Sequence, residues 1–272
     1  MRIDLKGKMQ TGISTASLFS RFNTEDALEF LNKNKIETAE VFLESYCEYQ
    51  PDFASVLKGA KGDLSVHSVH TLTTQFEPQL YSINERAKKD SFFLLDNAMT
   101  VAERIGAKHY TFHGGARFKK TPIVLDYDRV GRITQEIIDV CKKHGVTLTY
   151  ENVHWGYYNF VGFFSEMRKR TDGLKATLDV KQARQSGISY KEYVEDMGED
   201  IVTVHLSDVK EDGKMCVPGK GITDFYDLFS RIKDKGFNGA ALIEVYKSDY
   251  EDFDELFASL DYVKNLAEKV FK

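Results

Sequence analysis

The feature that most constrains this chain is an alternation of strand-like and helix-like segments along its whole length. Short runs rich in β-branched and aromatic residues alternate with longer segments whose apolar residues recur at helical spacing. The strand-like runs number eight and cover residues 9–19, 37–43, 63–70, 108–115, 146–151, 174–179, 201–208 and 239–246. Eight strands separated by helices predict an α/β fold, a closed parallel (β/α)8 TIM barrel rather than an open sheet.

The helical segments between these runs carry recognisable start and stop signals. The segment 84–105 has a broad apolar stripe and is followed by Gly106, and the segment 127–144 is followed by Gly145. A terminal helix is predicted over 252–270. Because neither a linker nor a shift in composition interrupts the pattern, residues 1–272 are expected to form a single domain.

Composition narrows the class of protein. The net charge of −5 argues against a surface built to hold nucleic acid, so no nucleic-acid partner is expected. Three widely spaced cysteines do not suggest a disulfide framework. Residues 1–12 lack the apolar core of a signal peptide, and no apolar run approaches the length of a membrane span. We therefore expect a cytoplasmic protein with no membrane partner, and leave homo-oligomer formation open.

Ionisable residues stand where five of the predicted strands end. Right-handed crossovers place the carboxyl ends of all barrel strands at one mouth, so these side chains are expected to converge. A carboxylate at the end of an apolar strand is costly unless something compensates its charge. The five residues are His113, Glu151, Asp179, His205 and Glu244.

Four of these residues, on neighbouring strands, form a candidate metal site: Glu151, Asp179, His205 and Glu244. Three carboxylates and one imidazole suit one divalent cation, with Mn²⁺ favoured and Mg²⁺, Co²⁺ or Zn²⁺ also compatible. The alternative is a set of salt bridges around the rim. Lys181 is the only obvious basic residue within reach of the strand ends, which disfavours that alternative.

Several segments, in order along the chain, resemble the xylose isomerase-like barrels, the superfamily of sugar phosphate isomerases and epimerases that also contains AP endonuclease family 2. They are TGIST, SVH, YTFHGG, LTYENV, LDVKQA, VHLSD, PGKGITDF and LIEVY. The resemblance implies that Glu151, Asp179, His205 and Glu244 bind one divalent metal. It also implies that Glu151 and Glu244 act as the acid/base pair on opposite faces of a sugar.

The resemblance favours a metal-dependent isomerase or epimerase of a sugar, sugar phosphate or polyol, acting by proton transfer through an enediolate. An inosose dehydratase-like lyase uses much the same site, and a non-catalytic sugar-binding barrel is a further alternative. An AP endonuclease-like hydrolase is disfavoured because Gln182 stands where that branch has a zinc-binding histidine. The segment GKMCVPGKG also lacks that branch's Asp-x-His ligands.

The remaining polar residues near strand ends are candidate contacts for a small-molecule sugar or polyol substrate. His67 and His113 either hydrogen-bond sugar hydroxyls or are satisfied within the barrel wall. Trp155 either stacks on a sugar ring or anchors its loop. Lys181 is expected to contact a hydroxyl or acidic substituent. The PGKG segment is interpreted as a conformational turn that caps the next helix. His70 is the last residue of its predicted strand or the first residue of the loop that follows.

Overall fold

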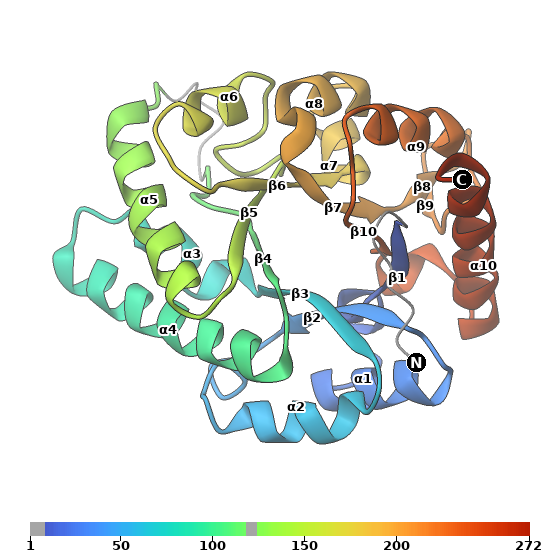
Figure 1. Ribbon diagram of the computed structural model, residues 1–272, viewed down its shortest axis with the longest axis horizontal. Helices are drawn as coiled ribbons and strands as arrows, with labels where there is room; N and C mark the ends of the chain where they lie inside the picture. The colour runs from blue at the N-terminus through green and yellow to red at the C-terminus, as the bar shows by residue number, and fades with distance from the viewer. Residues whose placement is uncertain (1–8, 118–123) are drawn as a thin grey trace.

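The computed structural model describes residues 9–117 and 124–272, and eight of its strands close into one parallel barrel (Figure 1). The predicted (β/α)8 TIM barrel is therefore confirmed. Around the barrel the strands follow the order β1-β10-β7-β6-β5-β4-β3-β2. Their bounds are β1 Gln10–Ser14, β2 Thr38–Leu43, β3 Ser65–Thr71, β4 His109–Phe112, β5 Thr147–Glu151, β6 Lys175–Asp179, β7 Ile201–Leu206 and β10 Ala240–Ile243.

Helices surround the barrel, and the longer ones begin and end close to the predicted positions. The side chain of Asn84 caps α4, and Gly106 ends that helix with a φ of 85°. The side chain of Asp252 caps α10. The main helices are α1 Thr24–Lys33, α2 Phe53–Lys61, α4 Glu85–Ile105, α5 Tyr127–Lys143, α6 Phe163–Arg168, α8 Tyr190–Met197, α9 Phe225–Asp234 and α10 Phe253–Val270.

Two short helices and one pair of two-residue strands are additions that the sequence pattern did not predict. They are α3 (Glu77–Leu80), α7 (Val180–Gln185) and an antiparallel pair of two-residue strands, β8 (Asp208–Val209) and β9 (Met215–Cys216). Elements of two to six residues are too short to show a full helical or strand period. Each of them follows a barrel strand, and α3 and α7 carry residues of the candidate site described below.

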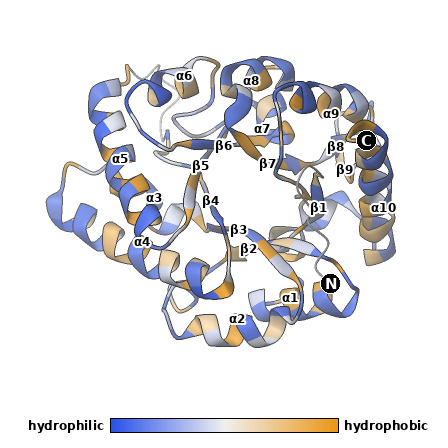
Figure 2. Ribbon diagram, viewed as in Figure 1, coloured by the Kyte–Doolittle hydropathy of each residue, from blue (hydrophilic) through white to orange (hydrophobic). Residues whose placement is uncertain are grey.

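The hydrophobic core lies between the barrel and the helices, while the barrel interior is unusually polar. The helices present hydrophobic stretches among hydrophilic ones, as expected of elements with one buried face (Figure 2). Hydrogen bonds cross the interior between strands that are not neighbours. The His67 imidazole on β3 lies 2.9 Å from the Thr203 hydroxyl on β7, and the Thr111 and Thr177 hydroxyls on β4 and β6 are 3.5 Å apart.

The junction between β1 and β2 is tight at Gly12. A β carbon at this position would lie 2.0 Å from the carbonyl oxygen of Thr38. These two strands pair through only two residue pairs, Ile13 with Ala39 and Ser14 with Glu40. Glycine therefore permits the approach that closes the barrel at this seam.

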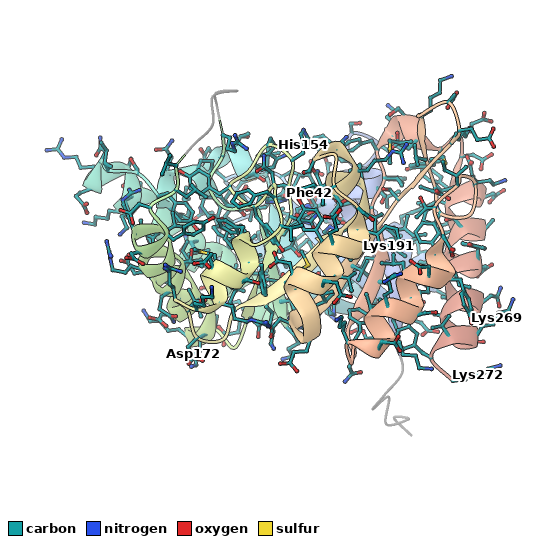
Figure 3. All side chains as sticks on the ribbon, turned by 90° about the horizontal axis from the view of Figure 1, so that it is seen from above. Phe42, His154, Asp172, Lys191, Lys269 and Lys272 are labelled. Atoms are coloured by element: carbon teal, nitrogen blue, oxygen red, sulfur yellow. The ribbon has the colours of Figure 1, made fainter. Side chains whose placement is uncertain are left out.

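The two ends of the barrel are easily distinguished from the side. Phe42, near the carboxyl end of β2, and His154, after β5, lie toward one side of the molecule, and Asp172, before β6, lies on the other (Figure 3). The first side is the mouth onto which the carboxyl ends of the strands open. In the described part of the chain no helix is long and apolar enough to cross a bilayer.

Candidate metal centre and active site

The four predicted metal ligands converge at the mouth of the barrel around the Nδ1 atom of His205. This atom lies 3.1 Å from Glu244 Oε2, 3.4 Å from Glu151 Oε1 and 3.9 Å from Asp179 Oδ2. Ligand atoms of Glu151, Asp179 and His205 all lie within 4.8 Å of one another. The spacing is that of side chains able to share one small ion.

The strand ends explain why these four side chains meet. Glu151 and Asp179 are the last residues of β5 and β6, His205 is the fifth residue of β7, and Glu244 follows β10 directly. The Asn152 side chain locks two of these ends together. It donates to the Asp179 carbonyl at 2.9 Å and accepts from the Asp179 amide at 2.8 Å.

The chemistry of these donors fits a divalent cation. Among the described residues, four buried polar atoms of this region lack a hydrogen-bond partner: Glu151 Oε2, Glu244 Oε2, His205 Nε2 and Lys181 Nζ. Burial raises the pKa of Asp179 to about 7, an effect that Lys181 opposes and Glu151 reinforces. Asp179 therefore lacks enough compensating positive charge in its buried position, and a bound divalent cation would supply it.

Glu40 is a buried carboxylate at this site that the sequence analysis missed. Its Oε2 accepts hydrogen bonds from Ser68 Oγ and Thr111 Oγ1, both at 2.7 Å. Its Oε1 accepts from His70 Nδ1 at 2.7 Å and from Ser14 Oγ at 3.2 Å. The signal available was a lone glutamate inside the apolar strand 37–43.

Glu40 also carries the charge that faces His205 from below the ligand cluster. Its Oε1 lies 3.0 Å from His205 Nε2, although the ring N–H is not aligned for a hydrogen bond. The two side chains are therefore in close contact without a hydrogen bond. Burial alone would raise the pKa of Glu40, but the charges of His205 and His70 outweigh it and hold that pKa well below its usual range.

His113 and Trp155 border the cluster on the β4–β5 side. His113 Nε2 lies 3.2 Å from Glu151 Oε2, and the His113 and Trp155 rings are 5.7 Å apart. On its other side, His113 Nδ1 lies 3.2 Å from Glu77 Oε2. Burial alone would lower the pKa of His113, but Glu77 and Glu151 outweigh that effect and raise it to about 9.

Lys181 borders the cluster on the β6–β10 side. Its side chain is 2% exposed, and its ammonium lies 3.9 Å from the centre of the Tyr246 ring. Burial lowers the pKa of Lys181, but Asp179 and Glu244 outweigh it and raise that pKa above its usual value. Lys181 is therefore a buried cation whose hydrogens lack an acceptor among the described residues.

Comparison with known proteins decides the family. The model of the family described as "Xylose isomerase-like TIM barrel" matches residues 27–266. The chain belongs to the xylose isomerase-like TIM barrel family. This bears out the resemblance seen in its motifs. A search of curated proteins finds no significant match.

Several solved structures share the fold at low sequence identity. A D-tagatose 3-epimerase-like protein is 19% identical with a TM-score of 0.77, over 96% of this chain and 98% of the other. The D-psicose 3-epimerase of Clostridium cellulolyticum H10, solved with D-tagatose, is 15% identical with a TM-score of 0.77, over 97% and 100%. The IolI protein with a bound zinc atom is 16% identical with a TM-score of 0.73, over 97% and 98%.

Two histidines of this xylose isomerase-like barrel lie within β3. His67 is the third of seven residues in β3, and its ring packs against His109 inside the barrel, so its predicted place at a strand end is wrong. The register shift at Ala39/Glu40 accompanies this placement. His70, which the sequence left between the strand and the following loop, is a buried residue of β3.

The glycine turn of this barrel is built around one of its own carboxylates. Asp208 accepts hydrogen bonds from the backbone amides of Gly219 at 3.1 Å, Gly221 at 2.9 Å and Thr223 at 3.0 Å. A β carbon at Gly221 would lie 2.2 Å from the carbonyl oxygen of Val209. These amides are already committed to an internal anion, which favours the interpretation of PGKG as a conformational turn.

Proposed function

We propose that this protein is a divalent metal-dependent isomerase or epimerase of a sugar or polyol. The observation that carries the proposal is the pair of carboxylates, Glu151 and Glu244, which lie 3.4 and 3.1 Å from His205 Nδ1. Each has one buried oxygen without a hydrogen-bond partner among the described residues. Such a pair can remove a proton from a substrate carbon and return it.

In this proposal Glu151, Asp179, His205 and Glu244 hold the metal. When bound, a divalent cation polarises a substrate carbonyl and stabilises the enediolate that forms on proton removal. Mn²⁺ is our first choice because most of the donor atoms are carboxylate oxygens, and Mg²⁺, Co²⁺ and Zn²⁺ fit the same donor set. The zinc atom bound by the structurally similar IolI protein is in keeping with a metal at this site.

Three residues of the chain are proposed to orient the substrate over the carboxylates. Trp155 offers a ring face beside His113, and His113 itself is 14% exposed beside Glu151. The Lys181 ammonium is placed to donate to a substrate oxygen, since it has no hydrogen-bond acceptor among the described residues. The names of the similar structures, D-tagatose 3-epimerase-like protein and D-psicose 3-epimerase, support a small sugar as substrate.

The competing enzyme classes differ in what the site must contain. An AP endonuclease-like hydrolase would need further zinc ligands, whereas Gln182 is turned toward the His154 ring, with Oε1 2.6 Å from Nδ1. We therefore expect no substantial cleavage of abasic DNA. A dehydratase acting on an inosose remains the nearest alternative, since it can use the same carboxylates and metal. A non-catalytic sugar-binding barrel would keep the metal without exchanging substrate protons.

The test combines metal analysis with isotope exchange. We expect the purified protein to bind about one divalent ion, and to incorporate solvent deuterium at carbon in at least one member of a panel of ketoses, aldoses and inososes. Water loss from an inosose would move the assignment to a lyase. Metal binding without exchange into any substrate would favour the binding barrel, and robust zinc-dependent incision of abasic DNA would favour the endonuclease.

A further inference from the structure

The buried carboxylate Glu77 lies behind His113, on the side away from the metal ligands. It is the first residue of α3 and is fully buried. Its Oε1 accepts from the Tyr110 hydroxyl at 2.6 Å and from the Thr71 hydroxyl at 3.2 Å. Its Oε2 accepts from His113 twice, from the backbone amide at 3.0 Å and from ring Nδ1 at 3.2 Å.

These two bonds constrain the orientation of the His113 ring, whose Nδ1 also lies 2.8 Å from the Thr73 hydroxyl. Because a carboxylate only accepts, the nitrogen that faces Glu77 must carry a hydrogen. The bond from the backbone amide fixes the position of the His113 main chain. The bond from Nδ1 fixes the rotation of the imidazole ring about the Cβ–Cγ bond. Nε2 is then directed to the opposite side, where it lies 3.2 Å from Glu151 Oε2.

His113 in turn distinguishes the two oxygens of Glu151. Oε1 faces His205 Nδ1 at 3.4 Å, on the side of the other metal ligands, and Oε2 faces His113. A carboxylate that both binds a metal and moves a proton needs one oxygen for each task. The ring contact keeps Oε2 apart from the ligand cluster.

We infer that Glu77 is a positioning residue, which through His113 holds Glu151 with Oε1 toward the metal ligands and Oε2 available for proton transfer. The inference rests on the proposed function for the role of Glu151. Glu77 acts by accepting hydrogen bonds from His113 at a fixed position. It does not act by supplying charge to the substrate.

This role predicts an unusual order of activity among Glu77 variants. Glu77→Gln can present its amide oxygen to His113 and its amide nitrogen to the two hydroxyls, which can rotate to accept. Glu77→Asp keeps the charge but withdraws the carboxylate by one methylene. Glu77→Gln should therefore retain most of kcat, while Glu77→Asp and Glu77→Leu lose it by about 10²-fold, the cost of a misplaced catalytic group. All three are compared at saturating Mn²⁺, so that a weaker hold on Glu151 Oε1 does not lower metal occupancy.

The matched control is Thr73→Val, because the Thr73 hydroxyl also lies 2.8 Å from His113 Nδ1. Its removal leaves both bonds to Glu77, so kcat should not change. Should Glu77→Leu fail to fold, the comparison of Glu77→Gln with Glu77→Asp remains decisive. Equal losses in these two variants, or Glu77→Asp more active than Glu77→Gln, would overturn the inference.

A second measurement does not depend on activity. In ¹⁵N spectra of the histidine rings, Nδ1 of His113 should carry a hydrogen in wild type, Glu77→Gln and Thr73→Val, and lose that fixed signature in Glu77→Asp. A bare Nδ1 in wild type would overturn the inference even in an active enzyme. If no substrate exchanges protons, the proposed function fails and the inferred role of Glu77 toward Glu151 fails with it, whereas the ring signature still reports whether Glu77 orients His113.

Discussion

Glu244 Oε2 and His205 Nδ1 are 3.1 Å apart, yet substitution of the two residues should impair the enzyme in different ways. Glu244→Gln keeps an oxygen that can face the metal but removes the basic carboxylate. It should therefore retain much of its metal and lose solvent-proton exchange at substrate carbon by about 10²–10⁴-fold, the contribution typical of a general acid or base. The measurement is deuterium incorporation at matched metal occupancy.

His205→Ala is the contrasting variant, since His205 is assigned as a ligand without a proton-transfer role. It should lose metal first, and excess Mn²⁺ or Co²⁺ should restore part of its activity. A Glu244→Gln protein that binds metal and exchanges protons at the wild-type rate would rule out Glu244 as an acid or base.

At the scale of single residues, sequence reasoning succeeded where a side chain ends a strand. Glu151 and Asp179 could be placed because strand ends in a barrel share one mouth. Glu77 could not be placed, because it lies in a polar loop before Pro78 and nothing local marks it as buried. His67 was misplaced because β3 continues for four residues beyond it, to Thr71, so His67 lies inside the barrel and not at its mouth.

At the scale of elements, the seam between β1 and β2 should be the least tolerant of added atoms. Gly12→Ala would place a β carbon 2.0 Å from the Thr38 carbonyl oxygen, so the strands must separate. We expect a loss of about 1–3 kcal/mol in the free energy of unfolding, as for overpacked cores. Denaturant titration of the purified variant measures it.

Gly59 in α2 provides the matched control, because a β carbon there meets no atom within 4 Å. Gly59→Ala should stabilise the protein by about 0.5–1 kcal/mol through the helical preference of alanine. If the two variants had the same stability, the close approach at Gly12 would not matter to barrel closure.

Element boundaries followed from the sequence where capping residues mark them, as at Asn84 and Gly106 of α4. The β8–β9 pair and α7 did not, because they are too short to show a period, and the turn after β8 also depends on contacts distant in sequence. Asp208 shows this best: it belongs to β8, and its carboxylate organises a turn eleven or more residues away. Spacing along the chain does not encode such a contact.

At the scale of the whole molecule, the polar barrel interior should make stability sensitive to acid. Burial, reinforced by His109, lowers the pKa of His67 to about 3, although the Glu40 charge opposes this. Burial, reinforced by Lys108, lowers that of His109 to about 4. The unfolded chain binds these protons near pH 6.5, so stability should fall as pH drops from about 6.5 toward 4, on the order of a few kcal/mol.

Chemical denaturation at a series of pH values measures this dependence, and His67→Gln should flatten it. His144 is the control histidine, because its hydrogen bonds to Asp96 and Glu103 outweigh partial burial and raise its pKa. His144 therefore stabilises the fold at low pH, and His144→Gln should not flatten the acid dependence. Identical curves for wild type and His67→Gln would contradict this account of the interior.

The Glu40 network has a consequence for how the barrel assembles. Its partners come from β1, β3, β4 and β7, strands that lie on different arcs of the ring (Figure 1). A fragment ending before β7 would bury this carboxylate without the His205 charge, and a fragment starting after β2 would leave His205 among carboxylates without Glu40. Neither half is electrostatically complete. The contact between β2 and β7 therefore forms only when the second half of the barrel docks on the first, which makes a half-barrel fragment less stable than the closed ring.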